Sequence, residues 1–226
     1  MSPNEILFHV NGQFKSPDEI RERINKFGNS YSNTIYETIH NSKVLDSDGQ
    51  IFYKWPSRLL SNFGMTRRGP FHENSAEILH SCWIAIGARL IEINNAVRKS
   101  GLSRDRYIIE LSDRERNGVI AEIWQITKEL LQYTMGDTCY GLVGASKILF
   151  SVLPEIVLPV DNAQWLHVFK TVDLGDVIYY MASDIKKWEG ITGVQLNRLD
   201  RTERLTTIPS VYNVMAMLAR PKKSEI

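Results

Sequence analysis

Two long segments with helical periodicity constrain the fold of this chain more than any other feature. In residues 74–101, and again in residues 112–136 where Ser112 or Asp113 supplies a cap, apolar side chains recur every three or four positions, as on one face of an α-helix. The apolar positions are Leu79, Cys82, Trp83, Ile86, Leu90, Ile93 and Val97 in the first segment, and Ile120, Ile123, Trp124, Ile126, Leu130 and Leu131 in the second. Because helices of this kind must cover their apolar faces with other helices, the pattern predicts a helical protein.

The ends of the expected helices carry recognisable signals. Gly101 and Gly136 are expected to end the two long helices, since glycine closes a helix without a steric penalty. Ser16 directly before Pro17 is a typical helix start and predicts a helix from there to about Lys26. Further helices are predicted at about residues 145–152, 162–171, 176–187, 195–203 and 209–218.

Strand signals are weak by comparison. Residues 6–10 and 107–111 are short runs of β-favouring side chains, but neither has a convincing hairpin partner. We therefore expect at most a small β ribbon near the N-terminus, within residues 6–14.

Length and composition fit one globular unit. With 226 residues, of which 43% are hydrophobic and 23% charged, the chain is long enough to bury a substantial core. No repeat, low-complexity block or flexible linker divides it. We predict a mainly all-α fold with a single domain over residues 1–226, and two lobes of about 1–105 and 106–226 are the alternative.

Several classes of protein are disfavoured by what the sequence lacks. The longest apolar run, residues 148–160, is too short to cross a bilayer, and residues 1–14 lack the pattern of a signal peptide. Cys82 and Cys139 form neither a disulfide framework nor a metal-binding spacing. We expect a cytoplasmic protein with no membrane association, no metal and no cofactor.

The charges are balanced overall but clustered along the chain. A net charge of +1, from 27 basic and 26 acidic residues, gives no global field that would attract nucleic acid. The basic clusters are Arg67 with Arg68, Arg98 with Lys99, Arg104 and Arg106, Arg198 with Arg201 and Arg204, and Arg220 with Lys222 and Lys223. Each cluster suits a solvated face, whereas several that converge on one groove would bind a phosphate backbone.

Residues 52–74 combine aromatic and basic side chains in what we expect to be a loop. Tyr53 and Trp55 suit stacking on nucleic-acid bases, while Arg67 and Arg68 suit phosphate neutralisation. In the alternative interpretation the aromatic side chains plug the core and the arginines face water.

The most distinctive segment is 141–169. Its glycines predict a helix, a tight turn and a second helix that starts at Gly144, an arrangement whose exposed amides grip a phosphate. The residues expected at that phosphate are Gly141, Val143, Gly144, Ala145 and Ser146. After an apolar helix, Pro159 and Val160 lead to Asp161, which is placed at the start of another helix.

This segment resembles the helix-hairpin-helix DNA glycosylase superfamily. The resemblance covers about thirty residues: a hairpin at 143–147, an apolar helix, and Pro-Val-Asp at 159–161 opening a helix that carries Trp165. It implies DNA as partner, with a modified or damaged base flipped into a pocket that includes Trp165, Tyr53 and Trp55. It further implies that Asp161 stabilises the sugar cation or activates water, as in glycoside hydrolysis, and that Lys147 is the candidate amine nucleophile.

The chain departs from the family pattern in two respects. The hairpin lacks the Leu-Pro-Gly-Val-Gly form, and Lys147 precedes Asp161 by fourteen residues, about one helical turn less than in the family. No cysteine cluster follows, so no iron–sulfur centre is implied.

Plainer interpretations of the same residues stay open. Asp161 with Gln164 fits a capping box, and Trp165 fits a core position. Lys147 fits a surface lysine or a partner of Glu155 or Asp161. At the level of function, the alternatives are a non-catalytic helix-hairpin-helix DNA-binding module and an antiphage effector of unknown activity. The glycosylase hypothesis itself allows a role in DNA repair or in defence against modified foreign DNA.

Overall fold

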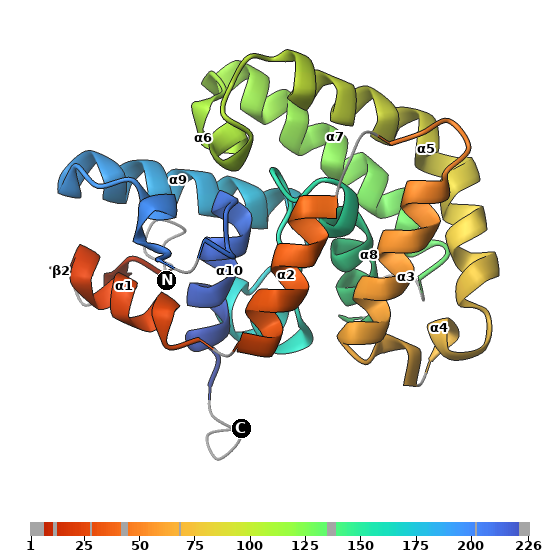
Figure 1. Cartoon of the computed structure of the whole chain (residues 1–226), viewed down its shortest axis with the longest axis horizontal. Helices are drawn as coiled ribbons and strands as arrows, with labels where there is room; N and C mark the ends of the chain where they lie inside the picture. The colour runs from red at the N-terminus through yellow and green to blue at the C-terminus, as the bar shows by residue number, and fades with distance from the viewer. Residues whose placement is uncertain are drawn as a thin grey trace.

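The structure, a computed structural model, describes residues 7–10, 13–27, 29–41, 45–67, 69–134, 139–201 and 203–221. It confirms the predicted mainly all-α fold, in which helices surround a common interior (Figure 1). The α-helices are α1 (Pro17–Asn25), α2 (Asn29–Asn41), α3 (Gln50–Asn62), α4 (Pro70–Glu73), α5 (Ser75–Lys99), α6 (Tyr107–Glu110), α7 (Asp113–Leu131), α8 (Cys139–Val152), α9 (Leu174–Thr192) and α10 (Ile208–Leu218). Short turns of other helix types are η1 (Met65–Arg67), η2 (Arg104–Arg106), η3 (Gln164–Phe169) and η4 (Leu196–Leu199).

The helix starts predicted at Ser16 and Ser112 are present, whereas the helix predicted to start at Gly144 begins at Cys139 instead. The Ser16 side chain accepts a hydrogen bond from the Glu19 N–H at the start of α1. Ser112 and Glu115 form a reciprocal capping box at the start of α7. Each cap satisfies backbone donors that the first turn of a helix leaves without partners, so the local sequence is enough to specify it.

A small ribbon precedes these helices. Strand β1 (His9–Val10) pairs antiparallel with β2 (Gln13–Phe14), and His9 faces Phe14 in the register. The ribbon expected near the N-terminus is therefore confirmed, although Ile6 lies outside the described residues. The second β-favouring run, 107–111, is instead helical, because Tyr107 and the two isoleucines that follow it bury their side chains in α6 without any strand to pair with.

The prediction of a loop at residues 52–74 is also wrong. The segment forms α3, η1 and α4, because Phe52, Trp55, Leu59 and Leu60 share one buried face at helical spacing. In place of the helix expected at 195–203, the structure has only the short turn η4.

Helix α8 is the most deeply buried element and runs through the interior behind α2 and α3 in Figure 1. Every residue from 141 to 160 is buried, and α8 packs mainly against α3 and α7. A helix that is apolar on all sides is expected in the interior. One cluster of buried apolar side chains extends through the described residues from Leu7 to Ala216. Within the same residues, no helix has both the length and the apolar character that a membrane crossing requires.

Candidate functional site

Lys147 lies inside α8 and is almost completely buried, with 5% of the residue exposed. Its Nζ sits 4.8 Å from the centre of the Phe63 ring, at the C-terminal end of α3. No hydrogen bond to Nζ is found among the described residues. Burial lowers the pKa of Lys147 from its usual 10.5 to about 8, and the nearby negative charge of Asp161 opposes that change. The interpretation of Lys147 as a surface lysine is therefore wrong.

Asp161 closes the capping box that the sequence predicts. Its Oδ1 accepts a hydrogen bond of 2.8 Å from the Gln164 N–H, and its own N–H donates to Gln164 Oε1 over 2.7 Å. The Gln164 side chain is buried and donates to Asn213 Oδ1 in α10 over 2.8 Å. The residues after Asp161 are therefore fixed both to their own first turn and to α10.

Asp161 also forms an ion pair with Arg220, just beyond the end of α10. The Arg220 Nη1 donates to Asp161 Oδ2, and about a third of each side chain is exposed. The carboxylate thus pairs with a guanidinium, and its charge also acts on the buried amine of Lys147, whose pKa it influences. The structure therefore brings the two predicted catalytic residues together.

A hydrogen-bonded contact within the interior sets their relative position. The Ser146 hydroxyl accepts from the Val160 N–H over 3.1 Å and lies 3.2 Å from the Val160 carbonyl oxygen. Ser146 precedes Lys147 and Val160 precedes Asp161. The contact therefore holds the backbone of both site residues at a fixed separation.

The prediction of a phosphate-binding hairpin at residues 141–147 is wrong. Gly141, Val143, Gly144, Ala145 and Ser146 all lie within the continuous helix α8 and are buried. Beyond the first turn of a helix the amides bond within the helix, so those of Val143, Gly144, Ala145 and Ser146 are not free to bind a phosphate.

Close packing against a neighbouring helix explains why residue 144 is a glycine. A Cβ at this position would stand 2.9 Å from Cε2 of Phe71 in α4, too close for any side chain. Residues 135–138, between α7 and α8, lie outside the described residues, and with them Gly136, the residue expected to end the second long helix.

The predicted base-pocket residues do not share one cavity. Trp55 is buried in α3. The interpretation of its side chain as a core anchor is therefore correct, and the prediction that it lines an open base pocket is wrong. Tyr53 is half-buried and its hydroxyl lies 3.2 Å from His80 Nδ1, beside a cavity of about 300 Å³ between α3 and α5. Trp165 lines a different cavity of about 560 Å³, together with Leu166, Lys170, Thr171 and Val172.

Trp165 belongs to η3, a turn of π-helix. Its indole Nε1 is buried and makes no hydrogen bond within the described part of the chain. At the other end of η3, Lys170 adopts a positive φ of 53°. π-Helical turns interrupt regular hydrogen bonding and occur often at functional sites, and this one follows directly after Asp161.

One of the predicted phosphate contacts, Arg67, belongs to the short turn η1. Arg67 is exposed at the end of η1, whereas Arg68 lies outside the described residues. Figure 1 shows the C-terminal ends of α3 and α10 on the same side of the molecule. Across the described ranges, no group of three or more His, Cys, Asp or Glu side chains is arranged to hold a metal ion.

Sequence reasoning missed two members of the site, Phe63 and Arg220. Both reach Lys147 or Asp161 through tertiary contacts across long stretches of chain, which no local spacing reveals. In comparisons with known proteins, no family model, no curated protein and no solved structure matches the chain.

Proposed function

We propose that this protein is a DNA glycosylase-like enzyme that hydrolyses the N-glycosidic bond of a modified or damaged base. The observation that supports the proposal most directly is a buried amine, Lys147, whose pKa responds to the charge of a carboxylate, Asp161, at the start of a helix. The resemblance of residues 141–169 to the glycosylase superfamily adds to it, although the hairpin part of that resemblance is lost.

In this proposal Asp161 acts on the sugar. As the N-glycosidic bond breaks, the base leaves with the bonding electron pair and positive charge develops on C1′ and the ring oxygen. A carboxylate held by the helix N-terminus stabilises that charge. Water then adds to C1′, and its proton passes to Asp161.

Lys147 offers a covalent alternative at the same position. With a pKa of about 8, roughly a tenth of the amine is neutral at pH 7, far more than for an exposed lysine. The neutral Nζ would attack C1′ while the bond to the base breaks, and opening of the sugar ring would leave a Schiff base.

Arg220 connects the proposed chemistry to DNA. A backbone phosphate is a natural competitor for the guanidinium that now pairs with Asp161, since arginine binds phosphate in a bidentate manner. Such an exchange would free Asp161 when DNA is bound. The non-catalytic hairpin module is a weaker candidate, because the glycines it requires are buried in α8.

The test is excision from duplex DNAs that carry different base modifications, read by alkaline cleavage and by mass spectrometry of released bases. Asp161→Asn keeps an acceptor for the cap but removes the charge, so we expect a folded protein with a loss of excision of about a hundredfold or more. The matched control is Asp173→Asn, which alters another aspartate that caps a helix, at the start of α9. Equal excision by the Asp161 and Asp173 variants would exclude the proposed role of Asp161.

Borohydride trapping distinguishes the two chemical routes. A trapped protein–DNA adduct that disappears in Lys147→Met but persists in Lys187→Met would establish the covalent route. Lys187 is the appropriate control because its amine also lies over a phenylalanine ring, that of Phe14, at 5.4 Å. Excision without any trapped adduct would assign hydrolysis to Asp161 and water.

A further inference from the structure

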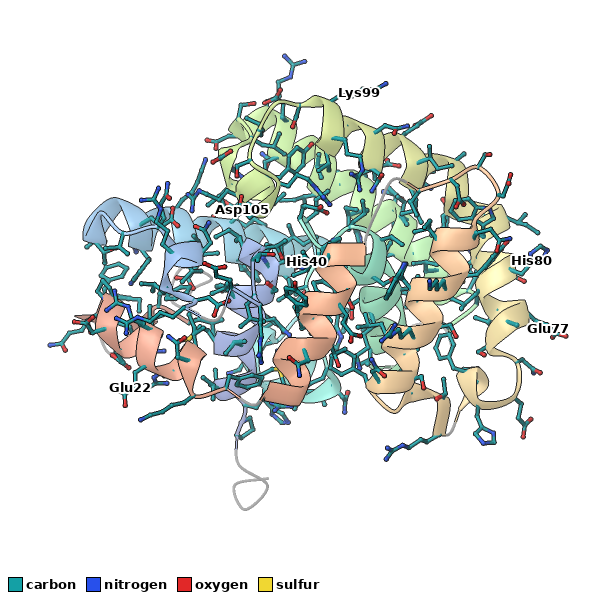
Figure 2. The ribbon with its side chains drawn as sticks, viewed as in Figure 1. Glu22, His40, Glu77, His80, Lys99 and Asp105 are labelled. Carbon is teal, nitrogen blue, oxygen red and sulfur yellow. The ribbon has the colours of Figure 1, made fainter. Side chains whose placement is uncertain are left out.

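A polar cleft lies between α2, the η2 turn and the segment that leads into α10. It consists of two adjoining cavities of about 660 and 330 Å³, which share His40, Asp105 and Thr206. Figure 2 labels His40 and Asp105 near the centre of the view. Both cavities lie within the size range of small-molecule sites. Neither Lys147 nor Asp161 lines the cleft, so it is separate from the site proposed above.

Glu155 contributes a buried carboxyl group to the smaller cavity. Only 1% of the residue is exposed. One carboxylate oxygen, Oε1, accepts a hydrogen bond from Arg104, but Oε2 has no partner within the residues that the structure describes. Burial raises the pKa of Glu155, while Arg104 and Arg98 act in the opposite direction. A buried acceptor that lacks a donor is costly, so a ligand that supplies an N–H or O–H would be bound favourably there.

An aromatic wall borders the larger cavity. The rings of Tyr36 and His40, one turn apart on α2, have centroids 3.8 Å apart. Tyr36 is 40% exposed, an unusual position for a large ring in a protein that buries most others. A planar ligand would find a stacking surface here.

The charges around the cleft favour a neutral ligand. A cation at Glu155 would approach the Arg104 and Arg98 guanidinium groups. An anion in the larger cavity would approach three acidic side chains, Asp105, Asp200 and Glu203, which outnumber the one arginine of its lining, Arg204. Only a ligand without net charge avoids both repulsions while it donates a hydrogen bond to Glu155.

We propose that this cleft binds a neutral nucleoside whose base carries an amino group. The amino N–H donates to Glu155 Oε2 in the smaller cavity, and the rest of the molecule lies in the larger one against the rings of Tyr36 and His40. The polar side chains of Asp105 and Asn197 line the larger cavity and can bond the sugar hydroxyls.

Isothermal titration of the full chain with adenosine and with purine riboside tests the proposal. Purine riboside has the same ring and sugar but no N–H donor on the base. We expect adenosine to bind at least about tenfold more tightly, the difference that one hydrogen bond to a charged or buried group contributes. Equal affinities for the two nucleosides would overturn the proposal. So would the absence of binding by either nucleoside, which would mean that water alone occupies the cleft.

Substitutions at Glu155 and Tyr36 locate the binding. In Glu155→Gln the Arg104 donor holds the amide oxygen, so the amide N–H₂ replaces Oε2 and opposes the ligand amino group. Binding of adenosine should fall about tenfold or more, whereas Glu122→Gln, which removes another arginine-paired carboxylate, should leave it unchanged.

If Glu155→Gln fails to fold, Tyr36→Ala provides the test, since this exposed ring can be removed without a cavity. Unaltered binding by Tyr36→Ala would contradict the proposal.

The outcome is independent of glycosylase activity. Asp161→Asn should bind adenosine as the unaltered protein does, because Asp161 lies outside the cleft. Failure of either proposal therefore leaves the other standing.

Discussion

Ser146 in α8 is hydrogen-bonded to Val160, fourteen residues further along the chain, over a distance of 3.1 Å from the Val160 N–H to the hydroxyl oxygen. This contact clamps the connector that follows α8 against the helix itself. Because the two residues immediately precede Lys147 and Asp161, the contact ties together the backbone positions that carry the amine and the carboxylate.

Removal of this hydroxyl should loosen the site. Ser146→Ala leaves the buried Val160 N–H without its partner, so we expect a loss of about 1–3 kcal/mol in the free energy of unfolding, measured by urea denaturation. Ser151→Ala is the control, because the Ser151 hydroxyl bonds only to the Ile148 carbonyl of its own helix, at 2.7 Å. If Ser146→Ala lowers the free energy of unfolding no more than Ser151→Ala does, the contact between Ser146 and Val160 is unimportant for stability.

The packing role of Gly144 predicts a strong effect of a single methyl group. Gly144→Ala should destabilise the protein by about 1–3 kcal/mol, because the added Cβ overlaps the Phe71 ring. Gly118→Ala provides the opposite control: this glycine lies within α7 with open space around it, so alanine should stabilise the helix by about 0.5–1 kcal/mol. Thermal melts of the two variants measure both effects, and equal shifts of the midpoint would argue against tight packing at Gly144.

The buried amine of Lys147 predicts how stability changes with pH. Its pKa is about 8 in the folded protein and near 10.5 when unfolded, so between these values the unfolded chain binds more protons. Stability should therefore rise with pH across this window, and the penalty of burying the charged amine, on the order of 3 kcal/mol, is fully present below pH 8.

Lys147→Met isolates this contribution. The variant should be more stable than the unaltered protein at pH 7, and the difference should shrink from pH 8 toward pH 10.5 in denaturation experiments. A difference that does not change with pH would mean that the amine keeps an ordinary pKa in the folded protein.

The two roles of Asp161 can be separated by stability. Asp161→Asn loses the ion pair with Arg220, which is partly exposed, so we expect a cost below about 1 kcal/mol. Asp161→Ala also loses the cap on Gln164 and should cost about 1 kcal/mol more. Chemical denaturation of the two variants side by side gives both values, and equal costs would show that the cap contributes nothing.

Local signals predicted the parts of the fold that local interactions specify. The apolar stripe on α5 and the caps at Ser16, Ser112 and Asp161 involve residues within one or two helical turns, so the sequence alone was sufficient. The same reasoning failed at 52–74, where aromatic and basic residues suggested an exposed loop. Those aromatic residues recur at helical spacing, and burial against α8 makes the segment helical.

The site itself depended on contacts that no local spacing contains. The glycines at 141 and 144 suggested a turn, but the tertiary structure places them inside α8, where Gly144 makes room for Phe71 from a helix about seventy residues earlier. Arg220 reaches Asp161 across 59 residues of chain.

The sequence by itself therefore determined that the chain is helical, where helices such as α1, α5 and α7 begin, and that Asp161 starts another. Only the tertiary structure decided that Lys147 is buried within the electrostatic influence of Asp161. It also decided that Glu155, which lines a cleft, keeps one buried oxygen without a partner among the described residues. Hydrogen-bonded caps and amphipathic periodicity act over a few residues, whereas the desolvation that gives Lys147 and Glu155 their unusual pKa values arises from segments that meet only when the chain is folded.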